Sequence, residues 1–266
     1  MGCSALLKKA SLVGAFFVSA LMVLPAQAFC PLQPDLSEVR VRQVVDGDTL
    51  KLADGRSVRL IGLNTPELGR KGRSAEPGAQ AAQRRLRALV AAGAGRVGLR
   101  LGTEARDHYG RTLAHVYDPR GRNLEAQLLA EGFGYQVAVA PNLDLVDCQR
   151  AAERQARAAR LGLWRKSPVQ EVGALRRGGF ALLRGRVERV ERNGGGLWIE
   201  LEGNLVVRVA PESLVRFDLR ALQALPGRRV EVRGWVVDRA RREVARPGQA
   251  RWLLPVSHGV MLEPLP

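Results

Sequence analysis

Three strand-like stretches joined by tight turns follow one another near the start of the chain, and they constrain its fold more than any other feature. Residues 39–45, 49–53 and 57–63 are rich in alternating and β-branched residues, with an Asp-Gly-Asp turn and an Asp-Gly turn between them. Such a meander is the usual opening of a small curled barrel.

Helices and strands alternate after this meander. Helices are expected where Ala, Leu, Gln and Arg dominate up to a closing Gly, and strands where β-branched residues cluster. The predicted helices span 79–92, 123–131 and 143–161, and the predicted strands span 97–101 and 112–117.

A second unit follows a Pro- and Gly-containing linker at 167–177. Five strand-like stretches, with one helical stretch at 214–225 between the third and the fourth, give the element order of an OB-fold. These strands are expected at 180–190, 197–201, 205–209, 229–237 and 252–256. The predicted fold class is therefore α+β and mostly β: a first barrel domain at 29–166 and a second OB-like barrel at 178–266.

Residues 1–28 have the pattern of a secretory signal peptide. Lys8 and Lys9 precede an apolar run, and Ala26-Gln27-Ala28 forms a small-residue cleavage site. The alternative is an uncleaved membrane anchor, but the apolar run is short for a membrane span. The pattern predicts a secreted or periplasmic protein without stable membrane association after cleavage.

Cleavage would remove Cys3 and leave only Cys30 and Cys148. An even pair of cysteines in an exported chain predicts one disulfide, which would tie the new N-terminus to the helical region before Trp164. The alternative is a pair of unpaired buried thiols, which suits an oxidising compartment less well.

The chain is strongly basic, with a formal net charge of +16. Such an excess suits a polyanionic partner such as nucleic acid or an anionic envelope polymer. Nearly all of the basic residues are Arg, a bias that the base composition of the coding DNA could also produce. Charge alone therefore does not identify the partner.

Three clusters of polar residues carry the chemistry. Asp48 and Asn64 lie at predicted strand ends, and their oxygens could hold a hard cation such as calcium. Glu67 is close enough to face the same pocket and to accept a proton from water. Arg59 and Arg111 could grip a phosphate. Cation, base and two arginines are the groups that in-line attack on a phosphodiester needs.

The clusters occur in the order Asp-Gly-Asp-Thr, Arg-Leu-Ile-Gly-x-x-Thr-Pro-Glu and Asp-x-Tyr-Gly-Arg, followed by Leu-Gly-Leu-Trp. Over about 39–165 this pattern resembles the thermonuclease (staphylococcal nuclease) family. The resemblance implies an OB-like five-stranded barrel with three helices, and calcium-dependent cleavage of DNA and RNA that leaves 3′-phosphate ends. It also implies that Glu67 is the general base and that Arg59 and Arg111 bind the scissile phosphate.

The same resemblance implies that the metal ligands are Asp48, the residue at position 64 and the backbone carbonyl of Thr65. Well-known members have Asp where this chain has Asn64. A neutral amide oxygen removes one negative charge, so metal affinity should fall although ligation is not excluded.

The nucleotide-stacking tyrosines of the family are not matched, because residues 136–140 are small and apolar apart from Gln136. Since base stacking supports single-strand affinity, substrate binding is expected to differ. His108 and Tyr109 are candidate substrate-binding residues, and the alternative for His108 is an exposed imidazole without a catalytic role.

The second barrel is also basic and offers aromatic side chains for base stacking: Phe180, Trp198, Phe217, Trp235 and Trp252. For Trp235, which is flanked by Gly234 and Val236, a place in the barrel core is expected. The hypothesis is a substrate-tethering domain, and the alternative is a structural or protein-binding module.

The sequence thus predicts an exported calcium-dependent endonuclease acting on DNA, RNA or both. The alternative is a non-catalytic nucleic-acid-binding protein on a nuclease scaffold. A base between two arginines argues against that alternative, because binding alone does not need Glu67, whereas Asn64 argues for it.

Overall fold

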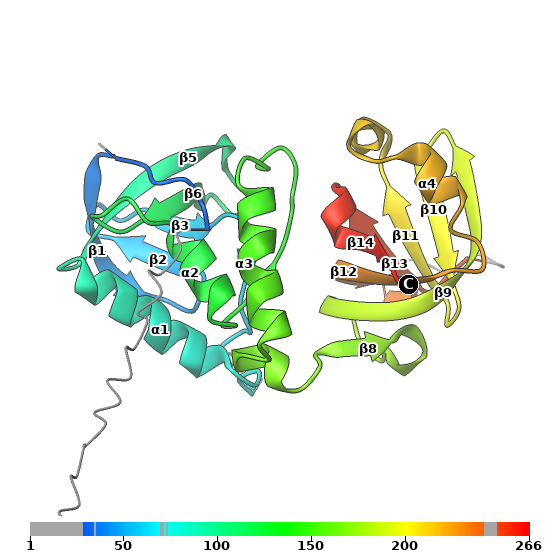
Figure 1. The fold of residues 1–266 in the computed structure, drawn as a ribbon, viewed down its shortest axis with the longest axis horizontal. Helices are drawn as coiled ribbons and strands as arrows, with labels where there is room; N and C mark the ends of the chain where they lie inside the picture. Colours follow the sequence, from blue (N-terminus) through cyan, green and yellow to red (C-terminus); the bar gives the residue numbers. More distant parts are fainter. Residues whose placement is uncertain (1–28, 35, 70–71, 73, 242–248) are drawn as a thin grey trace, which may run out of the picture.

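The computed structural model describes residues 29–34, 36–69, 72, 74–241 and 249–266. The predicted signal peptide at 1–28 lies outside the described residues. Figure 1 shows two barrels, one built from strands within residues 38–117 and the other from strands within residues 179–256, with helix α3 (Val146–Ala158) between them. None of the helices in the described part of the chain has the length and apolar character needed to cross a membrane.

The first barrel is a closed sheet of five strands in the order β1-β2-β3-β6-β5. Antiparallel pairing joins its neighbours except β3 and β6, which pair in parallel with Val58 opposite Thr112. Its core is built mainly from Leu and Val. The strands are β1 (Glu38–Val44), β2 (Thr49–Leu52), β3 (Ser57–Leu60), β5 (Arg96–Arg106) and β6 (Thr112–Tyr117).

Three helices cover this barrel: α1 (Ala79–Ala92), α2 (Leu124–Ala130) and α3 (Val146–Ala158). The Asn123 side chain caps α2 by accepting a hydrogen bond from the Ala126 amide at 2.8 Å. Helix α3 is shorter than the predicted helix at 143–161. Its C-terminal end follows from Arg160, which adopts a left-handed conformation with φ of 51°. A 3-10 turn at Gly162–Arg165 then buries Trp164.

The second barrel has the same strand order as the first. Its sheet runs β12-β13-β11-β10-β9, and pairing of β12 with β9 closes the ring, while β11 and β13 pair in parallel. Short strands β14 (Leu262–Pro264) and β8 (Val169–Glu171) extend it. The barrel strands are β9 (Gly179–Asn193), β10 (Gly196–Leu201), β11 (Leu205–Val209), β12 (Arg229–Asp238) and β13 (Trp252–Val256). The predicted fold class is confirmed: both barrels are OB-like.

Two stretches differ from the sequence prediction. The helix expected at 214–225 is a 3-10 turn at Pro211–Arg216 followed by α4 (Leu219–Gln223). The interruption follows from Asp218, whose carboxylate accepts hydrogen bonds from the amides of the first turn and so starts a new helix. The expected linker at 167–177 contains β8, which pairs in parallel with β9, and a 3-10 turn at Val172–Ala174.

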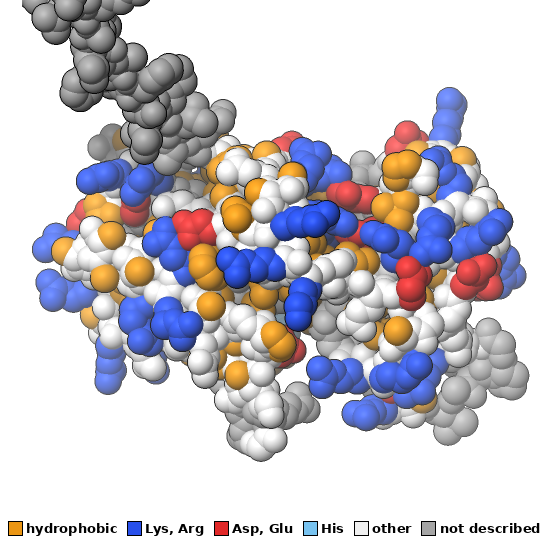
Figure 2. Space-filling view, turned by 60° about the horizontal axis from the view of Figure 1, so that its bottom comes forward, with side chains coloured by type: hydrophobic (Ala, Val, Ile, Leu, Met, Phe, Trp, Pro, Cys, Tyr) orange, Lys and Arg blue, Asp and Glu red, His pale blue; other side chains and the backbone are white. Residues whose placement is uncertain are grey.

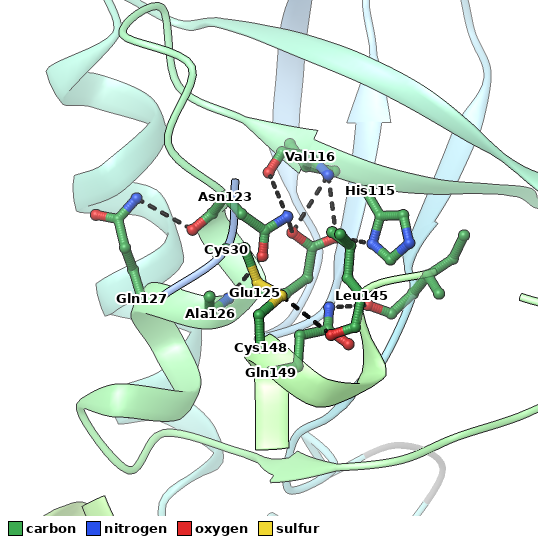
Figure 3. Close-up of a disulfide and its surroundings, with 11 residues drawn as sticks. Cys30, His115, Val116, Asn123, Glu125, Ala126, Gln127, Leu145, Cys148 and Gln149 are labelled. Carbon is green, nitrogen blue, oxygen red and sulfur yellow. Dashed lines mark hydrogen bonds and ion pairs between the residues drawn. A yellow bond between two sulfur atoms is a disulfide. The ribbon is translucent and has the colours of Figure 1, made fainter. Parts of the chain in front are cut away.

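A disulfide joins Cys30 to Cys148 and so ties the start of the described chain to α3. Figure 3 shows it beside the buried carboxylate of Glu125, which accepts a hydrogen bond from the side-chain amide of Asn123 at 2.6 Å. The cysteines are 118 residues apart. Closing so long a loop removes unfolded-state entropy worth about 5 kcal/mol in the chain-entropy model.

Charged side chains on α3 hold the second barrel against the first. Arg233 of β12 donates a hydrogen bond to Glu153 at 2.6 Å, and both side chains are at most 5% exposed. Arg157 makes a two-pronged contact with Glu231 at 2.6 and 2.7 Å. Burial alone would raise the pKa of Glu231, but the hydrogen bonds and charge of Arg157 outweigh it and lower that pKa.

Candidate active site

The short strands of the meander bring the predicted acidic, amide and arginine residues together. Asp48 precedes β2, Arg59 lies in β3, and Asn64 ends β4 (Leu63–Asn64). Thr49 pairs with Arg59, and the Leu60 amide donates to the Asp48 carbonyl at 2.9 Å. Strand β4 pairs with β7 (Tyr135–Gln136), with Asn64 opposite Tyr135, and Asn64 lines the same cavity as Asp48 and Arg59. Backbone pairing therefore sets the spacing of these side chains.

Asp48 and Arg59 form the buried centre of the site. One carboxylate oxygen of Asp48 accepts hydrogen bonds from the Thr65 amide at 2.8 Å and the Thr65 hydroxyl at 3.0 Å. The other lies 3.1 Å from Nη1 of Arg59. Nη2 of Arg59 in turn donates to Oδ1 of Asn64 at 3.2 Å. The four residues form one connected network, in which Arg59 faces both of the predicted metal-ligand side chains.

Asp46 adds a second carboxylate that the sequence analysis did not assign. It lines the same cavity and its Oδ1 accepts a hydrogen bond from the Asp48 amide at 3.1 Å. Burial, reinforced by the negative charge of Asp48, raises the pKa of Asp46 to about 6. The Asp-Gly-Asp motif itself carries the signal, because its two carboxylates are close enough along the chain to face one site.

A preformed turn positions Arg111. Asp107 accepts hydrogen bonds from the backbone amides of Tyr109 and Arg111, and its second oxygen accepts from Nε of Arg111 at 2.7 Å. Burial would raise the pKa of Asp107, but these hydrogen bonds lower it below its ordinary value. Gly110 has φ of 78°, a conformation that favours Gly and closes the turn. The parallel pairing of β6 with β3 then sets this turn beside Arg59.

The predicted side chains share one cavity of about 870 Å³. Those that line it are Asp48, Arg59, Asn64, Glu67, His108, Tyr109 and Arg111. Glu67 is exposed, and Tyr109 is 73% exposed with the Arg111 guanidinium 5.4 Å from its ring centre. Thr65 is buried beneath Asp48 instead of lining the cavity. The disulfide cysteines pack with the first barrel's core.

Other lining residues were not foreseen. Glu104 and Asn142 also line the cavity, and Trp235 lines it from the second barrel. The expectation that Trp235 lies in the barrel core is wrong, since it is 40% exposed. Alternation along β12 explains this: Val232 and Val236 point into the barrel, whereas Arg233 and Trp235 point out of it.

The oxygen atoms around Asp48 fit a hard cation better than a transition metal. The oxygen donors beside Asp48 are its own carboxylate, the Asp46 carboxylate and the Asn64 amide, whereas the imidazole that lines the cavity, His108, lies on the turn that carries Arg111. Within the described ranges no group of three or more His, Cys, Asp or Glu side chains could hold a metal ion. A cation here would therefore depend on the neutral oxygens of Asn64 and Thr65, and on its substrate, to complete its shell.

Comparison with known proteins matches the first barrel. Residues 57–166 match the family model described as "Staphylococcal nuclease homologue". The chain is 33% identical over 139 residues to endonuclease YncB of Bacillus subtilis (strain 168), covering 51% of this chain and 65% of that protein. It is 32% identical over 137 residues to the SPbeta prophage-derived endonuclease YokF of the same organism, covering 50% and 46%. These matches thus span less than two thirds of both relatives.

A shorter relative is covered more fully. The chain is 30% identical over 144 residues to the thermonuclease of Staphylococcus intermedius, and the match covers 84% of that protein and 51% of this chain. The family-model match ends at the close of the first barrel, so the second barrel lies beyond it. The chain therefore belongs to the staphylococcal nuclease family.

Proposed function

We propose that the protein is an endonuclease that hydrolyses phosphodiester bonds of DNA, RNA or both. The observation that carries this proposal is the meeting of Glu67, Arg59 and Arg111 with the Asp46 and Asp48 carboxylates in one cavity. A carboxylate that can act as general base, in the same cavity as two guanidinium groups, suits attack on a phosphate rather than binding alone. Nuclease names among the relatives support the same reaction class.

In the proposed reaction, the Glu67 carboxylate removes a proton from a water molecule whose oxygen attacks phosphorus. The bond from phosphorus to the 5′ oxygen breaks, and that oxygen takes up a proton from solvent water and leaves as a hydroxyl, while Glu67 returns its proton to solvent. The other product carries a 3′-phosphate. Arg59 and Arg111 donate hydrogen bonds to the phosphate oxygens as negative charge grows on them. Asp107 holds Arg111 in place through the hydrogen bond to its Nε.

We propose calcium as the cofactor, held by Asp48, Asn64 and the Thr65 carbonyl, with Asp46 nearby. When bound, the ion would neutralise phosphate charge and orient the substrate. The fit rests on the oxygen donors and on Asp46, whose pKa is raised to about 6 by burial and, to a lesser extent, by the negative charge of Asp48. A cation beside the two carboxylates would relieve that repulsion.

We propose that the protein acts outside the cytoplasm, in the periplasm or the medium. Support comes from the disulfide between Cys30 and Cys148, because such bonds persist in oxidising compartments. Cys30 also lies just beyond the predicted cleavage site. Fractionation of the producing cells tests this, and full-length protein in the cytoplasm would contradict it.

The deciding experiment is cleavage of single- and double-stranded DNA by the chain starting at Phe29, with calcium, magnesium or chelator. We expect calcium-dependent cutting, and a loss of about 10²- to 10⁴-fold in kcat for Glu67→Gln because the general base is removed. Binding of DNA without cutting under every metal would favour the alternative, a non-catalytic binding protein. Asn64 would then be the first residue to suspect, since it supplies no charge to the metal.

A further inference from the structure

Trp235 is the one large aromatic side chain that the second barrel, as far as it is described, contributes to the active-site cavity. It is 40% exposed, unlike its strand neighbours Glu231 and Arg233, which share its face of β12 and are buried against α3. The three residues are two positions apart and therefore lie in a row along the outer face of the strand. Glu231 and Arg233 therefore lie in the interface between the barrels, whereas Trp235, at the end of the row, lines the cavity.

A series of contacts with other aromatic rings supports the Trp235 side chain. Its ring meets Phe180 edge to face at 5.2 Å between ring centres, and Phe180 stacks on Tyr135 at 5.6 Å. Tyr135 contacts the buried Trp164 at 5.6 Å. The chain of rings crosses from the second barrel to the first, and such contacts restrict the orientation of the outermost ring. Trp235 is therefore a supported surface rather than a loose side chain.

The cavity combines this apolar surface with a charged one. Val137, Val139 and Ala140 line it together with Trp235, and their side chains are too small to stack on a base. Arg59 and Arg111 line the same cavity. A nucleotide has the same two parts, an anionic phosphate and a flat base with apolar faces. Only an unpaired base can offer its faces to a side chain, because a duplex buries them in its own stack.

We propose that Trp235 stacks on a base of single-stranded nucleic acid bound at the active site, so that the second barrel completes the substrate site. The proposal rests on the proposed function for the class of ligand. It assigns the barrel a direct part in substrate preference: single strands should bind more tightly than duplexes for as long as the Trp235 ring is present.

The test measures the Kd of a short dye-labelled single-stranded oligodeoxynucleotide and of its duplex, with calcium present. All variants carry Glu67→Gln to prevent cutting. We expect Trp235→Ala to raise the single-strand Kd by roughly five- to 150-fold, the range that corresponds to stacking of one base. The duplex Kd should change much less. Trp235→Phe retains a flat ring and should recover most of the affinity.

Trp198→Ala is the matched control, because Trp198 belongs to the same barrel but lines a separate cavity of about 150 Å³. It should leave the single-strand Kd unchanged. Circular dichroism and thermal unfolding check that each variant is folded. If Trp235→Ala is unstable, Trp235→Leu replaces it, because Leu keeps an apolar side chain but has no flat ring. A folded variant without the ring but with unchanged single-strand affinity overturns the proposal, and so does an equal loss in Trp198→Ala.

The two proposals fail in different ways. If the chain with Glu67 intact cuts DNA but Trp235→Ala binds single strands normally, the nuclease function stands and the stacking role is wrong. If no metal supports cutting but single-strand binding still depends on Trp235, the stacking role stands and the nuclease function is wrong.

Discussion

At the scale of single residues, Asn64 sets the charge of the proposed metal site. Its Oδ1 accepts a hydrogen bond from Arg59 at 3.2 Å, and Asp48 contacts the same guanidinium. We expect Asn64→Asp to tighten calcium binding by roughly tenfold or more, because ligand charge tunes calcium affinity. The calcium concentration that gives half-maximal cutting, and isothermal titration calorimetry, measure the change.

Asn64→Ala serves as the opposite variant, since it removes the oxygen altogether and should weaken calcium binding. The guanidinium of Arg59 limits the gain in Asn64→Asp, because part of the new charge pairs with it. Equal calcium affinity in the wild type and both variants would show that position 64 does not ligate the metal.

The sequence predicted that Asp48, Arg59 and Asn64 would lie close together, but it did not predict that Trp235 would line the same cavity. Asp48, Arg59 and Asn64 all lie within 17 residues of Thr65 along the chain, so short turns alone bring them together. Trp235 was misplaced because strand alternation gives two faces but does not say which one is covered by the other barrel. Glu231 and Arg233 were the available signal, since they share its face.

At the scale of elements, the contact between α3 and β12 holds the row formed by Glu231, Arg233 and Trp235 in place. Glu153 accepts hydrogen bonds from Arg233 and from the Gln136 amide, and it is 3% exposed. Removing one partner of a buried pair leaves an uncompensated charge. We expect Glu153→Gln to lower the free energy of unfolding by about 3 kcal/mol, the low end of the usual range because Glu231 remains close to Arg233.

Glu171→Gln is the matched control for this measurement by urea unfolding. Glu171 also pairs with an arginine, Arg229, at 2.7 Å, but both side chains are at least half exposed. An exposed pair contributes about 1 kcal/mol or less. Similar losses in the two variants would contradict the view that the buried Glu153–Arg233 pair fastens the barrels together.

The sequence predicts the ends of helices where a local signal marks them, but it does not predict the pairing of strands that are far apart along the chain. Gly93 and Asn123 fixed the end of α1 and the start of α2 close to their predicted positions. The parallel pairing of β3 with β6 joins residues far apart along the chain, such as Val58 and Thr112, and no local sequence pattern indicates this pairing. That pairing is what brings Arg111 to Arg59, so the complete site could be expected only through the family resemblance.

At the scale of the whole molecule, the question is whether nucleic acid binds to the basic charge spread over the surface or to the active-site cavity. The chain carries a net charge of +16, and Figure 2 shows Lys and Arg side chains spread over both barrels on one face. A protein that contacts phosphates releases counterions, so the logarithm of its affinity falls with the logarithm of salt concentration. For single strands the slope changes by about 0.7 for each phosphate contact.

Arg111→Gln and Arg87→Gln remove the same charge at different places. Arg111 lines the cavity, whereas Arg87 is exposed on α1 and does not line it. In the Glu67→Gln chain, we expect Arg111→Gln to weaken single-strand binding and to reduce the salt slope by about 0.7, the effect of one lost phosphate contact. Arg87→Gln should leave the slope unchanged within error. Equal reductions of the salt slope in the two variants would mean that the nucleic acid binds across the basic surface as a whole. They would contradict the proposal that it binds in the active-site cavity.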